Sequence, residues 1–362
     1  MADGIRSYLD AFGFTIEEIL KAKDEVAKRQ RNLVHLSGDR FLRRGAPSAA
    51  ADFQAILAQH WSSLFSDAGL ALYITLQRDS PNLMADVNSV AANLFCDPVS
   101  FRDLTAWCLF FAARDAALAT QMNCMAPRSE AHLSGGLLEA LKLSCRQWSD
   151  VVDAALERRR TTLTLDFIDH SILGGEQATG GDFAIILDVD GRGLQPGAVA
   201  QPSDRKIIPL LFQAKRYVRP NADVSQKHHA RGYQHALLGQ NSCRSSYVFY
   251  ENNTKDLDAK TISAPFPPLF KDVAKVHSPT TTAVLSESSD FATHLMTSLA
   301  DEHVAARAQS PEDALRMVFD QAHPGQLCRL AIIASEADAY EQYLQILDTL
   351  DREDNPTIGL QT

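Results

Sequence analysis

Residues 207–217 read IIPLLFQAKRY, and this run decides the fold because nearly every position before Gln213 is apolar. A short, almost continuous apolar run predicts a strand that is buried on both faces of a sheet. Successive side chains of a strand point to opposite faces, so Gln213 and Lys215 project from the same face. Polar side chains in a buried strand are costly unless they are paired or bind a ligand. A metal ion and its water would satisfy both.

The pattern on either side of this strand predicts a mixed α/β core. Glycine pairs at 174–175 and 180–181 mark a turn region before one of the neighbouring strands. The expected order is a helix, three strands, a helix and a strand. These elements cover residues 133–159, 161–168, 182–189, 207–217, 228–239 and 245–250 in that order.

Composition along the chain divides it into three parts. Residues 1–127 repeat apolar positions at helical spacing and predict a helical N-terminal domain. Residues 128–255 hold the mixed sheet. A proline-rich break at 265–268 then introduces a small C-terminal α/β region, residues 256–362. Within that region the pattern predicts helices near 289–308 and 311–321, a strand at 328–334 and an acidic last helix.

Several protein classes are disfavoured by composition. No run of 18 apolar residues is present, and charged residues interrupt positions 1–20, so we expect neither a membrane span nor a signal peptide. Six cysteines are scattered without metal-type spacing, which predicts buried thiols in a reducing, cytoplasmic setting. A net charge of -10 argues against indiscriminate coating of nucleic acid.

Local charge is different around the decisive strand. Between residues 205 and 244 eight basic residues face one acid, Asp223, for a local charge of +7. A solvated basic face and a nucleic-acid contact explain this excess equally well. The eight are Arg205, Lys206, Lys215, Arg216, Arg219, Lys227, Arg231 and Arg244.

Asp182 opens the strand predicted at 182–189, so it can converge with Gln213 and Lys215. The sequence EQATGGDF at 176–183, followed by FQAKR at 212–216, resembles the D and QxK motifs of the PD-(D/E)xK nuclease superfamily, in its Mrr-like variant. The resemblance continues through Gln234 and YVFY at 247–250, and it spans roughly residues 128–252. It implies a restriction-endonuclease-like core.

The resemblance assigns a role to each of these residues. Asp182 would be the principal metal ligand, the Gln213 carbonyl would lie near the metal, and Lys215 would contact the attacking water or the scissile phosphate. Oxygen ligands suit Mg²⁺, for which Mn²⁺ is expected to substitute. The alternative interpretations are structural: Asp182 as a turn acid and Lys215 as an edge lysine whose amine reaches solvent.

An additional acidic ligand is expected by the same resemblance. Glu176 is favoured because its spacing belongs to the motif. Glu130 competes, although an acid at that position also suits the first turn of a helix. Glu139 is a more distant candidate.

Residues around the site are expected to hold nucleic acid. Arg216, Lys227, Arg231 and Gln234 are the predicted contacts. His228, His229 and His235 have no acid or cysteine nearby in sequence, which favours a surface or phosphate-contacting role over metal binding. The glycine pairs lack the Lys-Ser/Thr of a phosphate loop.

The sequence as a whole predicts an Mg²⁺-dependent DNA endonuclease, with an anti-phage or restriction role implied by resemblance. A ribonuclease with the same site is the first alternative, because attack of a metal-bound hydroxide does not require deoxyribose. A catalytically inactive scaffold that binds nucleic acid or a partner protein is the second. The helical N-terminal domain is the predicted surface for a partner protein or for a second copy of the chain.

Overall fold

The structure is a computed structural model. It describes six isolated positions before residue 100 and most of the chain after it. The described residues are 17, 20, 21, 24, 64, 66, 100–102, 104–124, 126–155, 163–169, 181–189, 205–217, 221–228, 232–251, 268–284, 286–319, 329–336 and 338–354. Helices predicted before residue 100 therefore lie almost entirely outside the described residues.

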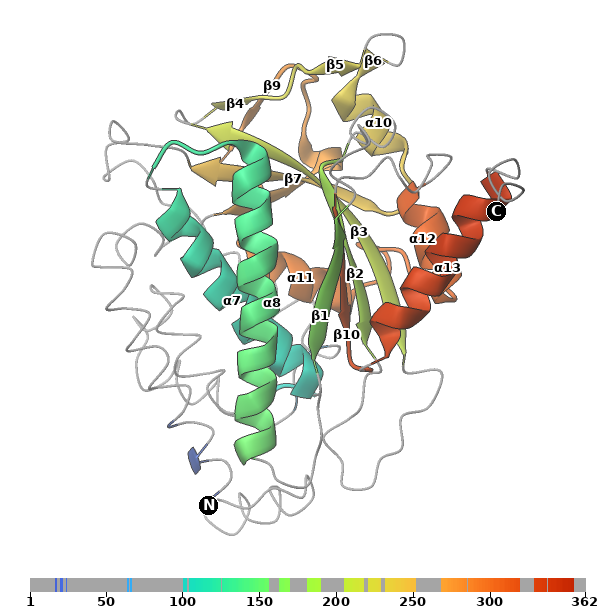
Figure 1. The fold of residues 1–362 in the computed structure, drawn as a ribbon. Helices are drawn as coiled ribbons and strands as arrows, with labels where there is room; N and C mark the ends of the chain where they lie inside the picture. The colour runs from blue at the N-terminus through green and yellow to red at the C-terminus, as the bar shows by residue number, and fades with distance from the viewer. Residues whose placement is uncertain are drawn as a thin grey trace.

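A six-stranded mixed sheet forms the centre of the molecule (Figure 1). Its strand order is β1-β10-β2-β3-β7-β8. The β10–β2 and β3–β7 pairs are parallel, and the other three pairs are antiparallel. The strands are β1 (Thr164–Asp169), β2 (Phe183–Val189), β3 (Lys206–Tyr217), β7 (Arg244–Glu251), β8 (Leu269–Asp272) and β10 (Arg329–Ala334).

The mixed α/β class is confirmed, and so is the order of helix, three strands, helix and strand. The helix before the sheet is α8 (Glu130–Ala155), and α10 (Gln234–Gln240) precedes β7. Ser129 caps α8, because its Oγ accepts a hydrogen bond from the His132 N–H at 3.3 Å. The structure adds short strands that the pattern did not predict: β4 (Asn221–Asp223), β5 (Lys227–His228), β6 (Gly232–Tyr233) and β9 (Thr281–Ala283).

The helix predicted at 228–239 is shorter than expected. His228 ends β5, which pairs with β6 in a two-stranded ribbon, and α10 begins only at Gln234. Gly232 has φ +88, a conformation that glycine adopts without steric cost and that a helix cannot contain. His228 and His235 therefore do not share a helix face.

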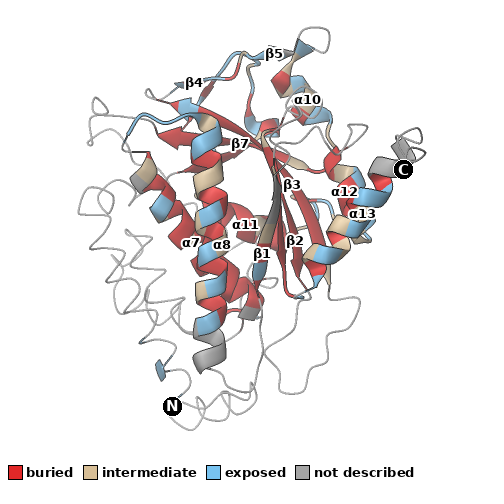
Figure 2. Ribbon diagram, viewed as in Figure 1, coloured by how far each residue is buried: buried red, intermediate tan, exposed pale blue. Residues whose placement is uncertain are grey.

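Helices cover both faces of the sheet, as Figures 1 and 2 show. On one face lie α7 (Leu104–Asn123), α8 and α11 (Phe291–Ala300); on the other lie α10, α12 (Pro311–Phe319) and α13 (Ala339–Asp354). Along β2, Ile185 and Leu187 belong to the first core, while Ile186 belongs to the second. The period of two along a buried strand thus divides one apolar run between two cores.

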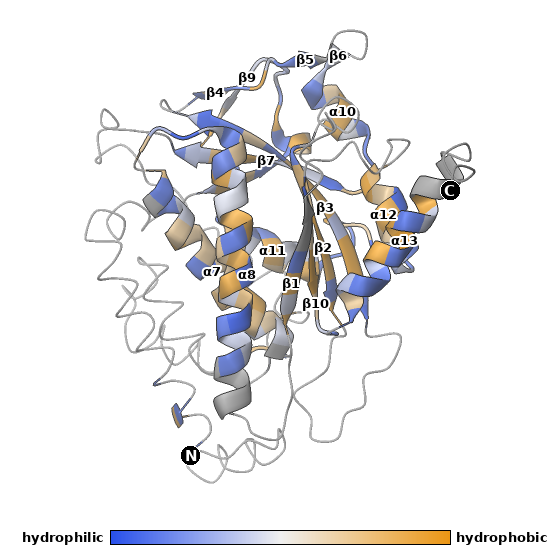
Figure 3. Cartoon of the chain, viewed as in Figure 1, coloured by the Kyte–Doolittle hydropathy of each residue, from blue (hydrophilic) through white to orange (hydrophobic). Residues whose placement is uncertain are grey.

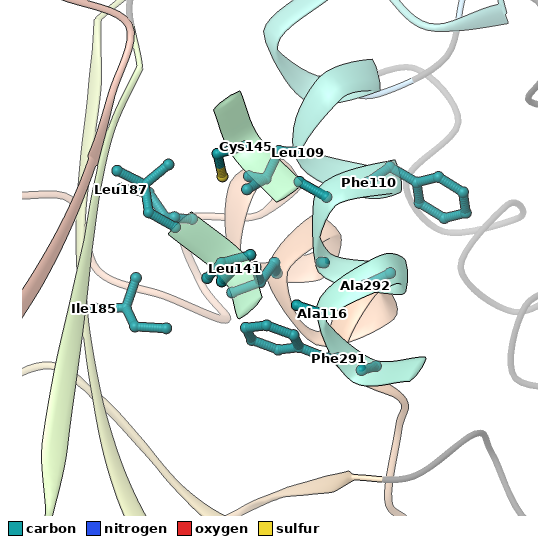
Figure 4. Close-up of a cluster of buried hydrophobic side chains, with 14 of the residues drawn as sticks. Leu109, Phe110, Ala116, Leu141, Cys145, Ile185, Leu187, Phe291 and Ala292 are labelled. Carbon is teal, nitrogen blue, oxygen red and sulfur yellow. The ribbon is translucent and has the colours of Figure 1, made fainter. Parts of the chain in front are cut away.

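The first core is lined by aromatic and aliphatic side chains from four elements. Figure 4 shows Leu109 of α7, Leu141 of α8 and Phe291 of α11 gathered beside Ile185 and Leu187 of β2. Trp107 and Trp148 join α7 to α8 edge to face, with ring centroids 5.5 Å apart. Hydrophilic and hydrophobic residues alternate along α8 and α13 (Figure 3), as expected for helices that cover a sheet from one side.

Segments from all three predicted parts of the chain build this core. α7 comes from residues 1–127, yet Trp107 and Phe111 are fully buried beside α8. β10 comes from residues 256–362, yet it lies between β1 and β2. Removal of residues 1–127 would therefore uncover the first core, and removal of residues 256–362 would open the sheet beside β2.

Buried polar networks fix the ends of two strands. Asp188 of β2 accepts hydrogen bonds from Arg205 Nε and Nη2, both at 2.7 Å, and from Tyr343 Oη at 3.0 Å. Arg244 of β7 binds Asp272 through Nε at 2.7 Å and Nη2 at 2.9 Å. Two residues of the basic stretch are thus used inside the fold, and the local charge available to a ligand is smaller than the sequence count.

His294 of α11 lies in the second of these networks. Its Nε2 is 3.5 Å from Ser246 Oγ, and its ring packs edge to face on Phe212. Burial lowers the pKa of His294 well below 6.5; the cations Arg244 and Lys275 lower it further, and Asp272 opposes them. The folded protein therefore keeps this ring neutral where the unfolded chain would bind a proton.

Stability should consequently fall as the pH decreases below 6.5. The unfolded chain binds the proton that the folded state excludes. The free energy of unfolding should therefore fall by about 1 kcal/mol between pH 7 and pH 5.5. Urea unfolding of the wild type and of His294→Gln across this range measures the effect. The variant should show the smaller pH dependence; equal slopes for both proteins would contradict the assignment.

Candidate active site

Asp182 lies just before β2 and is fixed to β3 by both its backbone and its side chain. Its N–H donates to the Phe212 carbonyl at 2.8 Å. Its Oδ2 accepts hydrogen bonds from the Ala214 N–H and from Gln213 Nε2, each at 2.8 Å. The antiparallel register, in which Phe183 pairs with Phe212, brings Asp182 next to Gln213. The predicted convergence of these two side chains is therefore present.

Gln213 is fully buried, and both ends of its amide are engaged. Nε2 donates to Asp182, while Oε1 accepts a hydrogen bond of 2.6 Å from Gln234 Nε2. The sequence predicted the carbonyl on the side of Asp182, whereas the structure has the nitrogen there. An ionised carboxylate only accepts hydrogen bonds, so the donor end of the amide faces Asp182.

Lys215 lies two residues further along the same face of β3. Its Nζ donates to Gln226 Oε1 at 2.7 Å, and only 6% of the residue is exposed. β3 is an interior strand, paired with β2 and β7. Lys215 is therefore not an edge-strand lysine whose amine lies in bulk water.

Two further glutamines, Gln234 and Gln226, hold this group together. Gln234, at the start of α10, is fully buried, and its N–H donates to the Gln226 carbonyl at 2.9 Å. Hydrogen bonds thus run from Asp182 through Gln213 and Gln234 to Gln226 and back to Lys215. Gln234 was predicted to contact nucleic acid; its burial assigns it to positioning Gln213 instead.

Polar side chains continue from Gln213 across the same face of the sheet. The register pairs Gln213 with Tyr247, and Tyr247 with Lys271. Within the described residues the buried Tyr247 hydroxyl has no hydrogen-bond partner, and burial raises the pKa of this phenol. Lys271 donates to the Ala283 carbonyl at 3.1 Å, and burial lowers its pKa. Sequence reasoning missed Lys271, because β8 is too short to show a pattern.

The candidate acids differ in position. Glu176 lies outside the described residues. Glu130 accepts a hydrogen bond of 3.0 Å from the Arg216 N–H at the end of β3, and Glu139 is exposed on the outer side of α8. Burial is the main cause of the raised pKa of Tyr250, and the charges of Asp182 and Glu130 both add to it. Asp182 and Glu130 both bind the C-terminal part of β3, Asp182 through the Ala214 N–H and Glu130 through the Arg216 N–H.

The donors present fit a hard, weakly held cation. In the described part of the chain no group of three His, Cys, Asp or Glu side chains could hold a metal ion. Asp182 offers carboxylate oxygen, and a 180° rotation of the Gln213 amide would turn its carbonyl toward the same side. Mg²⁺ is commonly bound by one or two protein oxygens and several waters, so this set suits it better than zinc.

The residues predicted to contact nucleic acid differ in their exposure and in their contacts. Lys227 is exposed, with its Nζ 4.6 Å from the centre of the Tyr233 ring. Arg216 is half-exposed and binds the Arg128 carbonyl at 3.1 Å. Arg231 and His229 lie outside the described residues, as does Arg219. His235 stacks parallel to Tyr247, and burial lowers its pKa.

Comparisons with protein-family models, curated proteins and solved structures found no match to this chain. Among the described helices, none is both long and apolar enough to cross a membrane. Four cysteines, Cys108, Cys124, Cys145 and Cys243, are buried free thiols, as expected.

A test of the metal site that needs no substrate uses Gln213→Glu. The new carboxylate would face Asp182, so without metal the protein should lose about 1–3 kcal/mol of stability at pH 7.5 through like-charge repulsion. Mg²⁺ or Mn²⁺ should then raise the Tm of the variant more than that of the wild type, because a cation that binds the folded state stabilises it.

Gln213→Met is the matched control, since it keeps the length of the side chain and removes its polar atoms. Melting curves of the wild type and the two variants are compared in EDTA and in about 10 mM Mg²⁺ or Mn²⁺, a concentration high enough for a weak site of oxygen ligands. A Gln213→Glu variant as stable as wild type and indifferent to metal would show that no cation site lies between residues 182 and 213.

Proposed function

We propose that this chain is a metal-dependent phosphodiesterase that cuts nucleic acid, with DNA as the expected substrate. The observation that carries the proposal is the pairing of buried polar side chains on one face of β3 with Asp182. Gln213 and Lys215 are buried in an interior strand, where a purely structural role would favour apolar residues. Burial of these two polar side chains lowers stability, and a role in binding a ligand would explain why they are present.

The chemistry of each side chain supports this reaction. Asp182 and the Gln213 amide would hold Mg²⁺, which when bound supplies an activated water and offsets negative charge. The Lys215 ammonium would donate hydrogen bonds to a phosphate oxygen and stabilise the charge that builds up on phosphorus. Gln234 binds the Gln213 oxygen on the side away from Asp182, so use of that oxygen as a metal ligand would require the amide to rotate and give up this hydrogen bond.

The resemblance to PD-(D/E)xK enzymes supports DNA as substrate and an anti-phage or restriction setting in the cytoplasm. The site itself contains no described group that would select against a ribose, so RNA cleavage is a distinct outcome of the same assay. A scaffold without activity is the third outcome. Partner binding through the N-terminal part of the chain belongs to the proposal as a route of control.

The decisive assay incubates the purified full chain with plasmid DNA and with total RNA, in Mg²⁺ or in EDTA. Cleavage should require the metal. Asp182→Asn and Lys215→Ala should each lower the rate by about 100-fold or more, because each removes an electrostatic contact to the metal or phosphate.

Lys142→Ala and Asp166→Ala are matched controls, because this pair forms a solvent-exposed salt bridge between α8 and β1. Both should cut at the wild-type rate. Circular dichroism melts verify that all variants fold. Unchanged cleavage by Asp182→Asn would refute the site, and metal-independent cleavage would refute the mechanism.

A further inference from the structure

The Lys215 ammonium is almost completely covered, and the residue that binds it is exposed. Lys215 is 6% exposed, whereas Gln226, which accepts its hydrogen bond at 2.7 Å, is exposed to solvent. A phosphate oxygen that approaches Lys215 must therefore meet the Gln226 side chain. The amide carbonyl of Gln226 lies where such an oxygen would accept the hydrogen bond.

The backbone around Gln226 is held by hydrogen bonds other than the one that its side chain accepts from Lys215. The Gln226 carbonyl accepts from the Gln234 N–H, and the Val224 N–H donates to the Thr280 carbonyl at 2.9 Å. Asp223 Oδ1 accepts from the Ser225 N–H at 2.8 Å, closing a tight turn just before Gln226. The position of the Gln226 backbone is thus fixed independently of its bond to Lys215.

We propose that Gln226 is a positioning residue that holds the Lys215 ammonium in place of a phosphate oxygen and gives it up when a phosphodiester binds. This inference deepens the proposed function and rests on it for the identity of the anion. A phosphate oxygen carries a formal negative charge whereas the amide oxygen carries only a partial one, so the Coulomb attraction to the ammonium is larger for the phosphate. A nucleic-acid backbone can therefore displace the amide, whereas a neutral solute cannot.

The same arrangement explains why a neutral residue suits position 226. A carboxylate there would form an ion pair with Lys215 and compete with the substrate. An apolar residue would leave the buried ammonium without this acceptor. Glutamine satisfies the ammonium and still yields to an anion.

Acylation of lysines by acetic anhydride, read residue by residue with mass spectrometry, tests the inference on the full chain. Gln226→Ala should raise the labelling rate of Lys215 by about tenfold, the factor that corresponds to one hydrogen bond to a charged group. Gln226→Glu should lower it. Inorganic pyrophosphate, added in EDTA, should protect Lys215 in Gln226→Ala at lower concentration than in wild type.

Lys271 is the internal control, because it is buried on the same face of the sheet but binds the Ala283 carbonyl. Its labelling should be the same in all three proteins. Equal labelling of Lys215 in wild type, Gln226→Ala and Gln226→Glu would overturn the inference. A parallel rise at Lys271 would also overturn it, since that would indicate general loosening of the fold.

Steady-state cleavage supplies a second readout. If Gln226 competes with the phosphate, Gln226→Ala should lower KM and Gln226→Glu should raise it, each with a smaller change in kcat. A residue with a purely structural role would lower kcat in both variants. If the Gln226 variants change the labelling of Lys215 as expected but the protein cuts neither DNA nor RNA, the nuclease function is refuted and the role of Gln226 stands. If the protein cuts nucleic acid but the labelling of Lys215 does not change, only the role of Gln226 is refuted.

Discussion

Burial of a glutamine and a lysine in an interior strand is the constraint on which the rest of this structure depends. Neither side chain of β3 can reach bulk water, so each needs a partner within hydrogen-bonding distance. Asp182 and Gln234 satisfy Gln213, and Gln226 satisfies Lys215. The start of β2, the first turn of α10 and the segment before β5 are consequently held at one end of the sheet, which is where Figure 1 shows the short strands and α10.

Much of this arrangement could be read from the sequence, because strand periodicity is a local property. The apolar runs at 183–189, 206–217 and 244–251 formed strands at nearly the expected bounds. The shared face of Gln213 and Lys215 followed from the period of two. The approach of Gln213 to Asp182 followed once β2 and β3 were paired, whereas Lys215 binds Gln226 instead.

What could not be read depends on contacts between distant segments. An apolar run such as residues 329–334 does not specify its neighbours, so its position between β1 and β2 was not foreseen. Arg205 and Arg244 count toward the basic stretch in the sequence, and only the structure shows that each binds a carboxylate, 17 and 28 residues away respectively. Gln226 gave no signal at all, because its role depends on a turn and a two-stranded ribbon whose shape no motif describes.

The place of β10 has a consequence for how the protein is made. β2 ends at Val189 and β10 begins at Arg329, so 139 residues (190–328) lie between two strands that are side by side in the sheet. At roughly 5–20 residues per second, a ribosome needs about 7–28 s to synthesise that interval. Throughout this time one edge of β2, the strand that Asp182 precedes, lacks its partner. Closure of the sheet therefore waits for residues 329–334, whereas the hydrogen bonds that join Asp182 to β3 do not involve that strand.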